Sequence, residues 1–532
     1  MNARFFVIIS AIIVLITTAI ADWPKFAGNL RNTGNIELNS SKNFSFDSIR
    51  IKWIFYTNDS ARGSPIIVDI NNDSFEEVIF GSSNGNIYVL DYDGKPLWNF
   101  KTNGSIESTP VSDDVDGDGK KEIAIGSNDG NLYLLNSEGV LKWRFKTGGK
   151  ITASPVIADL EGNGKKEIIF SSWDNNLYVL NCDGKEMRSF LTTARTESSP
   201  AIADLDGDGL LDIIFGSNDK AVHAMLYRGP VVSYKSNSNF ISSPTVMGNN
   251  TIIASSDNGR IYSLSISSEL GGKRRVCDSM GCHYKYSEIY KMNATWNNSV
   301  NGGIISSAGI ADIMNDSGNE IIIGSTNKNL YIFSEDGKKI KTYSTSEKIV
   351  SQPAIVDFNG DNSSEILFTT IGGEIILLNS SISSIWYYNI NERIVSSPAV
   401  SDIDNDNLPE IVVTTEMGNL YVFGIKPTRT TTISTIEVTT TSPVVSSVTY
   451  TTTTTTCTTT ITTTTITENK IGNKTLPEAV IKEINTSTTT ASRSISVFAP
   501  INYFDIILFF FFIFFILSLI LIALFFYKRF KF

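Results

Sequence analysis

Hydrophobic and polar residues follow one another in short blocks between residues 50 and 425. Short runs rich in Val, Ile, Tyr and Phe are separated by Gly, Asn and Asp. This alternation is typical of short β-strands joined by tight turns. No helical period of apolar residues occurs in the same region. The pattern therefore predicts that this part of the chain is all-β.

The blocks belong to one repeated unit. A Ser-Pro-like pair recurs about every 45 residues, and one step is longer because of an insertion at about 266–295. Each unit contains four predicted strands, and eight such units predict an eight-bladed β-propeller. The second residue of each pair marks the units: Pro65, Pro110, Pro155, Pro200, Pro244, Ala308, Pro353 and Pro398.

The two ends of the repeated region are offset by one strand. Trp53 precedes the first complete unit, whereas the last unit stops after "NLYVFG", one strand short. We expect residues 49–58 to supply the missing strand of the eighth blade, because a closed ring leaves no sheet edge open. Aromatic residues at equivalent places in the units are expected to fill the space between blades. They are Tyr88, Tyr133, Tyr178, Tyr331 and Tyr421, and Trp53, Trp98, Trp143, Trp296 and Trp386.

The ends of the chain differ from the repeats. An apolar run closing on Ala-Ile-Ala predicts a secretory signal peptide, with a membrane anchor as the alternative. A Thr-rich tract without amphipathic period predicts a disordered stalk. A long uncharged segment before a basic tail predicts one transmembrane helix, with a cleaved lipid-anchor signal as the alternative. The expected organisation is 1–21 signal peptide, 22–48 lead segment, 49–425 propeller, 426–503 stalk, 504–527 transmembrane helix and 528–532 cytoplasmic tail.

The predicted topology places the propeller outside the cell, held at the cell membrane by a single pass. The net charge of −11 argues against a nucleic-acid partner, which needs a basic surface. Several Asn-x-Ser/Thr sequons are compatible with a glycoprotein.

A carboxylate-rich loop follows the first predicted strand in six units. In "DLDGDGLLD" at 204–212, aspartates occupy positions 1, 3, 5 and 9. The residues at these positions in the six loops are Asp69, Asn71, Asp73 and Glu77; Asp114, Asp116, Asp118 and Glu122; Asp159, Glu161, Asn163 and Glu167; Asp204, Asp206, Asp208 and Asp212; Asp357, Asn359, Asp361 and Glu365; and Asp402, Asp404, Asp406 and Glu410.

Alternating oxygen side chains around a tight bend can surround a hard cation. Ca²⁺ accepts flexible shells of oxygen ligands, so the loops are predicted calcium sites. Polar hairpin turns are the alternative, since Asp and Gly also favour turns. The matched register of six loops favours calcium. The sixth unit has an incomplete set, Asp312, Asp316 and Glu320, because Met314 occupies position 3, and the fifth unit has no acidic loop.

Two kinds of known repeat resemble these units. "WPKFAGNLRNTG" at 23–34 and "LDYDGKPLWNFKT" are similar to the quinoprotein-type repeat, which implies an eight-bladed propeller with tryptophan docking. The acidic loops resemble the FG-GAP repeats of integrin α-subunits, which again implies calcium. The signal, stalk and anchor together look like those of an archaeal surface protein. Propellers include enzymes, scaffolds and adhesins, so this fold does not imply one function.

The candidate chemistry favours binding over catalysis. Quinoprotein dehydrogenases, which the repeats resemble, hold a cofactor in the central channel and often have adjacent cysteines, and none are adjacent here. His223 stands at the usual tyrosine position of a blade and is predicted to be structural. We expect a non-enzymatic protein that binds an unknown surface ligand, protein or glycan, in adhesion or envelope organisation. A membrane-tethered quinoprotein-like oxidoreductase and an envelope-protein assembly scaffold are the alternatives.

The insertion carries two further features. Cys277 and Cys282 flank a Ser-Met-Gly turn, which favours a disulfide in an exported protein, with a metal pair as the alternative. Lys273, Arg274 and Arg275 form either a solvated loop or a docking point for an anionic partner. Because strands alternate in direction, the acidic loops, the insertion and the stalk share one face. We expect the ligand at the opposite face, at the mouth of the channel.

Overall fold

The computed structural model describes residues 25, 28–36, 44–248, 250–278 and 281–425, with three strands between residues 432 and 469, and only the backbone of 270–287. The predicted signal peptide and C-terminal helix lie outside these residues. The chain divides into two compact units, Met1–Arg429 and Thr430–Phe532. Within the described residues the only helical element is the 3-10 turn η1 (Phe46–Ser48).

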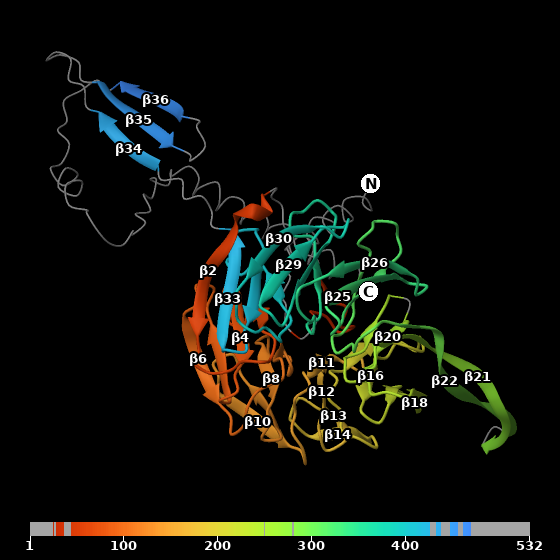
Figure 1. Cartoon of the computed structure of the whole chain (residues 1–532). Coiled ribbons are helices and arrows are strands. Elements are labelled where there is room, and N and C mark those ends of the chain that lie inside the picture. The colour runs from red at the N-terminus through yellow and green to blue at the C-terminus, as the bar shows by residue number, and fades with distance from the viewer. Residues whose placement is uncertain are drawn as a thin grey trace, which may run out of the picture. The chain divides into compact units, whose positions relative to one another are not determined.

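The first unit is an eight-bladed β-propeller, as predicted (Figure 1). Each blade is a four-stranded antiparallel sheet, and first strands of neighbouring blades contact one another around the central channel. The strands of blades 1 to 4 are β3 (Ile66–Val68), β4 (Glu77–Gly81), β5 (Asn86–Leu90) and β6 (Pro96–Lys101); β7 (Val111–Asp113), β8 (Glu122–Gly126), β9 (Asn131–Leu135) and β10 (Leu141–Lys146); β11 (Val156–Ala158), β12 (Glu167–Ser171), β13 (Asn176–Leu180) and β14 (Glu186–Leu191); and β15 (Ala201–Ala203), β16 (Asp212–Ser217), β17 (Ala221–Met225) and β18 (Val231–Lys235).

Blades 5 to 8 repeat this order, and the last one takes a strand from the N-terminal side. Their strands are β19 (Thr245–Val246), β20 (Ile252–Ser255), β21 (Arg260–Asp278) and β22 (Gly281–Ser299); β23 (Gly309–Ala311), β24 (Glu320–Gly324), β25 (Asn329–Ser334) and β26 (Lys339–Ser344); β27 (Ala354–Val356), β28 (Glu365–Thr369), β29 (Glu374–Leu378) and β30 (Ser384–Asn389); and β31 (Ala399–Ser401), β32 (Glu410–Thr414), β33 (Asn419–Ile425) and β2 (Ile49–Tyr56).

The predicted closure of the ring is confirmed. Strand β2 pairs antiparallel with β33, and Trp53 stands opposite Val422. The eighth blade is therefore built from both ends of the repeated region, which leaves its outer edge occupied.

Tryptophans on the outer strands join neighbouring blades. The indole Nε1 of Trp53 donates a hydrogen bond to the carbonyl of Tyr92 in the next blade, at 2.9 Å. A Cβ at Gly94 would lie 2.5 Å from the same ring, so only glycine fits beneath it. Equivalent bonds join Trp98 to Ser137, Trp143 to Cys182 and Trp296 to Glu335.

Trp386 departs from this pattern. It is buried and packs edge-on against Phe423, with ring centroids 5.6 Å apart. The outer strand of blade 8 arrives as β2 from the N-terminal side, so no hairpin turn in that blade offers a glycine and a carbonyl. Where the ring closes, Trp386 therefore packs as a core residue and does not dock on a hairpin.

The N-terminal segment crosses the inner strands of four blades. Successive carbonyls of Leu30, Arg31, Thr33 and Gly34 accept backbone hydrogen bonds from the first strands of blades 4, 5, 6 and 7, at 2.7–2.9 Å. Strand β1 (Asn35–Ile36) then pairs in parallel with β27. Gly34 has φ +67°, and a Cβ there would meet a backbone oxygen at 2.4 Å. This part of the lead segment therefore fills one side of the channel.

The insertion in blade 5 extends the last two strands rather than forming an irregular loop. Strands β21 and β22 continue as a long two-stranded ribbon that projects from the propeller in Figure 1. The register places Cys277 opposite Cys282. Their side chains lie outside the described part, as do those of Lys273, Arg274 and Arg275, so the disulfide and the docking point stay predictions.

The second unit contains one sheet, formed by β34 (Thr432–Glu437), β35 (Ser447–Thr455) and β36 (Ile461–Asn469). These strands fall within the predicted stalk, whose disorder stays a prediction. Among the described residues no helix has the length and hydropathy to cross a membrane.

Candidate metal centres and channel mouth

The acidic loops have a common backbone geometry, which the loop of blade 4 illustrates. Asp204 accepts backbone hydrogen bonds from Gly207 (2.7 Å) and Gly209 (3.0 Å), and Asp208 accepts one from Leu210 (2.9 Å). Gly207 and Gly209 have φ of +79° and +84°, a region that glycine adopts at little cost. The loop is thus held by its own carboxylates: both oxygens of Asp204 and one oxygen of Asp208 accept backbone N–H groups.

The carboxylate at position 9 is buried beneath each loop. In blade 4 one oxygen of Asp212 accepts a hydrogen bond from the backbone of Leu205 at 2.8 Å. Burial raises the pKa of Asp212 to about 6, that of Glu77 to about 7 and that of Glu365 to about 8. The same bond occurs in seven blades, with Glu77, Glu122, Glu167, Asp212, Glu320, Glu365 and Glu410 as acceptors.

Three of the loops bring carboxylates together closely enough to share one cation. In blades 2, 4 and 8 the residues at positions 1, 3 and 9 each offer an oxygen, and these oxygens lie within 4.8 Å of one another. The three clusters are Asp114, Asp116 and Glu122; Asp204, Asp206 and Asp212; and Asp402, Asp404 and Glu410.

Position 3 differs in the other loops. In blade 3, Glu161 accepts hydrogen bonds from Tyr227 and Asn163 instead of facing Asp159. In blade 1 the amide of Asn71 donates to Asp73 and Glu77, at 3.1 and 3.0 Å. In blade 7 the amide of Asn359 similarly donates to Asp361. Blade 6 has Met314 at this position, as its sequence indicates.

A lysine enters two of the three clusters, which the sequence analysis did not anticipate. The Nζ atom of Lys142 lies 2.5 Å from Asp116 and 2.9 Å from Glu122. Lys52 lies 2.6 Å from Asp404 and 2.9 Å from Glu410. Burial alone would lower the pKa of Lys52, but Glu410 and Asp404 raise it above its usual value. One ammonium group therefore already pairs with two of the three carboxylates in the clusters of blades 2 and 8.

The sequence contained a signal for this difference. Each lysine directly precedes a docking tryptophan, in Lys52-Trp53 and Lys142-Trp143. The equivalent residue is apolar in the other four blades with complete loops: Leu97, Met187, Val231 and Ile385. In blade 4, no ion pair of the described residues involves the acidic loop. Its three carboxylates thus form the donor set that best fits a bound dication.

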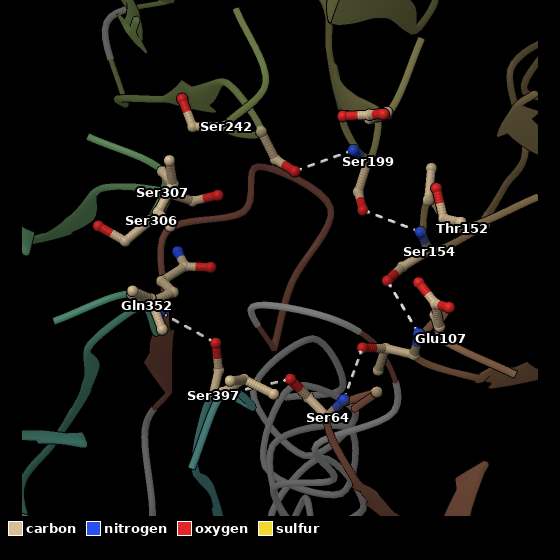
Figure 2. A pocket seen from close by; sticks show the side chains of 18 of the residues that line it. Ser64, Glu107, Thr152, Ser154, Ser199, Ser242, Ser306, Ser307, Gln352 and Ser397 are labelled. Carbon is tan, nitrogen blue, oxygen red and sulfur yellow. Dashed lines mark hydrogen bonds between the residues drawn. The ribbon is translucent and has the colours of Figure 1, made fainter. Parts of the chain in front are cut away.

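At the end of the channel opposite the acidic loops lies a ring of polar residues. Each blade contributes one, two positions before its first strand. We call these residues the hydroxyl ring: Ser64, Thr109, Ser154, Ser199, Ser243, Ser307, Gln352 and Ser397 (Figure 2). In six of its eight steps the backbone N–H of one member donates to the side-chain oxygen of the next, at 2.9–3.2 Å. The hydroxyls are therefore held in place by the backbone of the neighbouring blade.

A second ring, the rim, lies two residues earlier and surrounds the mouth. Its members are Arg62, Glu107, Thr152, Glu197, Ile241, Ile305, Val350 and Val395. The polar half is engaged with neighbouring side chains: Arg62 with Glu416 (2.5 Å), Glu107 with Asn128 (2.8 Å) and Glu197 with Arg195 (2.8 Å). The aliphatic half comes from blades 5 to 8. The mouth is thus polar on one side and apolar on the other.

Behind the ring the channel is closed by the N-terminal segment, whose reddish ribbon lies behind the side chains in Figure 2. The Asn32 side chain is fully buried and donates to the carbonyls of Pro200 and Pro244. The amide nitrogen of Gln352 donates to the carbonyls of Asn32 (2.6 Å) and Ala308 (2.9 Å). The remaining cavity at the ring has a volume of about 190 Å³.

His223 is a packing residue. It is 4% exposed and takes the tyrosine position of its blade. One ring nitrogen bonds Ser233 at 2.7 Å and the other Asp219 at 3.1 Å, as Tyr133 bonds Asp129 in blade 2. Burial lowers the pKa of His223. The predicted structural role is consistent with this environment.

Comparisons with known proteins support the propeller and its quinoprotein-like repeat. A sequence model of the Lambda-carrageenase beta-propeller domain matches residues 52–111 and 109–158. The structure is similar to quinohemoprotein alcohol dehydrogenases of Pseudomonas putida (TM-score 0.55, 9% identity, 80% of this chain and 82% of that one) and Comamonas testosteroni (0.52, 9%, 81% and 85%).

BamB of Moraxella catarrhalis is also similar, with TM-score 0.49 and 16% identity over 71% of this chain and 98% of that one. No curated protein matches the sequence. At these identities the likeness shows the fold alone. The resemblance to FG-GAP repeats and to archaeal surface proteins receives no support from these comparisons and stays a prediction.

Proposed function

We propose that this chain is a calcium-binding propeller, displayed at a cell surface, that binds a ligand at the channel mouth in adhesion or envelope organisation. The observation that carries the calcium part is the cluster of Asp204, Asp206 and Asp212, whose oxygens converge without a basic partner among the described residues. Carboxylates held this close repel one another, and a cation relieves that repulsion. The display on a membrane rests on the sequence of the two ends.

Several features support binding rather than catalysis. The two rim carboxylates, Glu107 and Glu197, are occupied by Asn128 and Arg195. The cavity of about 190 Å³ is smaller than the roughly 300–1,000 Å³ typical of pockets for cofactor-sized molecules. The matched propeller domain belongs to a carrageenase, which makes a glycan the first class of ligand to test.

The quinoprotein-like oxidoreductase is the second candidate, favoured by the fold of two quinohemoprotein alcohol dehydrogenases. The absorbance of the purified full chain at the quinone band, with and without added pyrroloquinoline quinone, separates the two. We expect no band that survives dialysis. A retained band together with alcohol-dependent dye reduction would establish the enzyme.

Calcium binding is tested by titrating the chelator-treated full chain with Ca²⁺ in a calorimeter, with Mg²⁺ as the matched ion. We expect saturable Ca²⁺ binding and a higher Tm, because a ligand that binds only the folded state stabilises it by mass action. Mg²⁺ at the same concentration should do less, since it requires stricter octahedral geometry. Equal responses to both ions, or none, would contradict the proposal.

A further inference from the structure

We propose that the hydroxyl ring binds one neutral sugar residue, the terminal unit of a glycan that enters through the channel mouth. This inference rests on the proposed binding function and specifies the class of ligand. It follows from which hydrogen-bonding groups the ring leaves unused.

Each of six ring hydroxyls uses one of its two acceptor lone pairs and leaves its O–H donor free. The oxygens of Ser64, Thr109, Ser154, Ser199, Ser243 and Ser397 each accept a backbone N–H from the neighbouring blade. Within the part of the chain that the structure describes, none of these hydroxyls has a protein acceptor. Each hydroxyl can also donate one hydrogen bond. Figure 2 shows the ring around a common centre with the N-terminal ribbon behind it, and ring members from all eight blades line one cavity.

One strong acceptor joins these donors. Gln352 is only 3% exposed, and its buried Oε1 atom has no hydrogen-bond partner among the described residues. Its amide nitrogen is held by Asn32 and Ala308, which fixes which end of the amide faces the cavity. In Figure 2 this oxygen points toward the middle of the ring. A buried carbonyl without a partner costs roughly 1–3 kcal/mol, so it favours a ligand or water that donates to it.

The combination selects the ligand class. An oxyanion offers only acceptors, so it would leave the Gln352 oxygen unpaired and face it with like charge. An ammonium group offers only donors, so it could bond the Gln352 oxygen but would leave the free O–H donors of the ring without an acceptor. A hydroxyl group both donates and accepts, and several adjacent hydroxyls on one small molecule satisfy both requirements.

Size and rim chemistry point the same way. At about 30 Å³ per molecule, the cavity of about 190 Å³ corresponds to roughly six waters. Such a volume suits a small ligand such as one sugar ring, which displaces that water. The aliphatic half of the rim, where Ile305 is 39% exposed, offers an apolar surface to the C–H face of the sugar. The polar half of the rim would lie against the hydroxyl groups of the sugar.

The test is saturation-transfer NMR on the calcium-loaded full chain, kept in a detergent without a sugar headgroup. The probes are D-glucose, D-galactose, D-mannose and N-acetyl-D-glucosamine, with sodium sulfate as the anion. We expect transfer to at least one sugar and no competition by sulfate. Ile305→Trp should block the mouth and abolish the signal. Ile340→Trp is the matched control, because Ile340 is 40% exposed on an outer strand, and it should leave the signal unchanged.

A second variant keeps the test decisive if Ile305→Trp does not fold. Ser307→Ala removes one hydroxyl of the ring without breaking a hydrogen bond seen among the described residues. It should lower the affinity for the sugar about three- to tenfold. The proposal would be overturned if no sugar received saturation transfer, or if neither Ile305→Trp nor Ser307→Ala changed the transfer. Competition by sulfate would overturn it as well. Calcium titration of the chelator-treated chain reports separately on the proposed function, so the two can fail independently.

Discussion

The acidic loops of blades 4 and 8 carry the same three-carboxylate cluster but balance its charge differently. In blade 8, Lys52 places its ammonium between Asp404 and Glu410, at 2.6 and 2.9 Å. In blade 4, the equivalent outer-strand residue is Val231, and the carboxylates have no basic partner among the described residues. The loop backbone is alike in both. One side chain on the outer strand therefore separates a cluster that has an ammonium counter-charge from one that has none among the described residues.

A repeated acidic loop therefore need not have the same affinity for a cation in every blade. The residues that surround a cation come from the loop, but the residue that competes with it comes from a strand about 20 positions later in blade 2, and from the far end of the chain in blade 8. A dication entering blade 8 must displace a partly buried ammonium, whose contact with Glu410 is shielded from water. We infer that calcium prefers blade 4.

The largest expected effect comes from removing the lysine of blade 8. In calcium-free buffer Lys52→Met leaves Glu410, which is 1% exposed, without its counter-charge. Breaking one partner of a buried pair costs about 3–5 kcal/mol, so the free energy of unfolding should fall by that order. Denaturant unfolding measures it, and calcium should restore much of the loss. Lys95→Met, which removes an exposed pair, is the control. A change below about 1 kcal/mol would mean that the lysine does not balance the cluster.

The converse change gives blade 4 a lysine. In Val231→Lys the new ammonium should reach Asp206 and Asp212 as Lys52 reaches its partners. The increase in stability that calcium produces through this loop, about 2.7 kcal/mol at one hundred times its dissociation constant, should disappear. Thermal unfolding with and without Ca²⁺ measures this. A calcium response equal to that of the unmodified chain would show that the two blades are not equivalent in this respect.

A smaller effect is expected from the charge at position 3. Asp206→Asn keeps an oxygen ligand but removes one negative charge, and should weaken calcium binding about tenfold, or about 1.4 kcal/mol. Asp404→Asn should change the calcium affinity less, because Lys52 already occupies its oxygen. Calorimetric titration of both variants measures the affinities, and equal losses would remove the distinction between the blades.

The sequence predicted the architecture well because each blade depends on local rules. The 45-residue spacing, the strand composition and the missing last strand foretold eight blades and the β2–β33 closure. The tryptophan positions and the resemblance to the quinoprotein-type repeat likewise anticipated the docking contacts, such as that of Trp53 with Tyr92. Trp386 fills the space between blades 7 and 8 as expected, but it lacks the hairpin contact of the other tryptophans because ring closure removes that hairpin.

The site was less predictable because its decisive contacts join distant residues. The loop around Asp404 does not itself indicate Lys52, which lies 352 positions earlier; the lysine stands out only when the residues before the docking tryptophans are compared between blades. The place of the N-terminal segment across four blades also depends on tertiary contacts, such as those of Asn32 with Pro200 and Pro244. The hydroxyl ring is visible in the sequence as the residue before each of seven prolines and before Ala308. Its unused donors and the Gln352 oxygen appear only when the blades are assembled.

The most direct test of the central claim is a crystal structure grown with Ca²⁺ and analysed by anomalous scattering, which locates each ion. We expect an anomalous peak among Asp204, Asp206 and Asp212. We expect none at the clusters of blades 2 and 8, where Lys142 and Lys52 lie. Equal peaks in all three clusters, or no peak in blade 4, would contradict it.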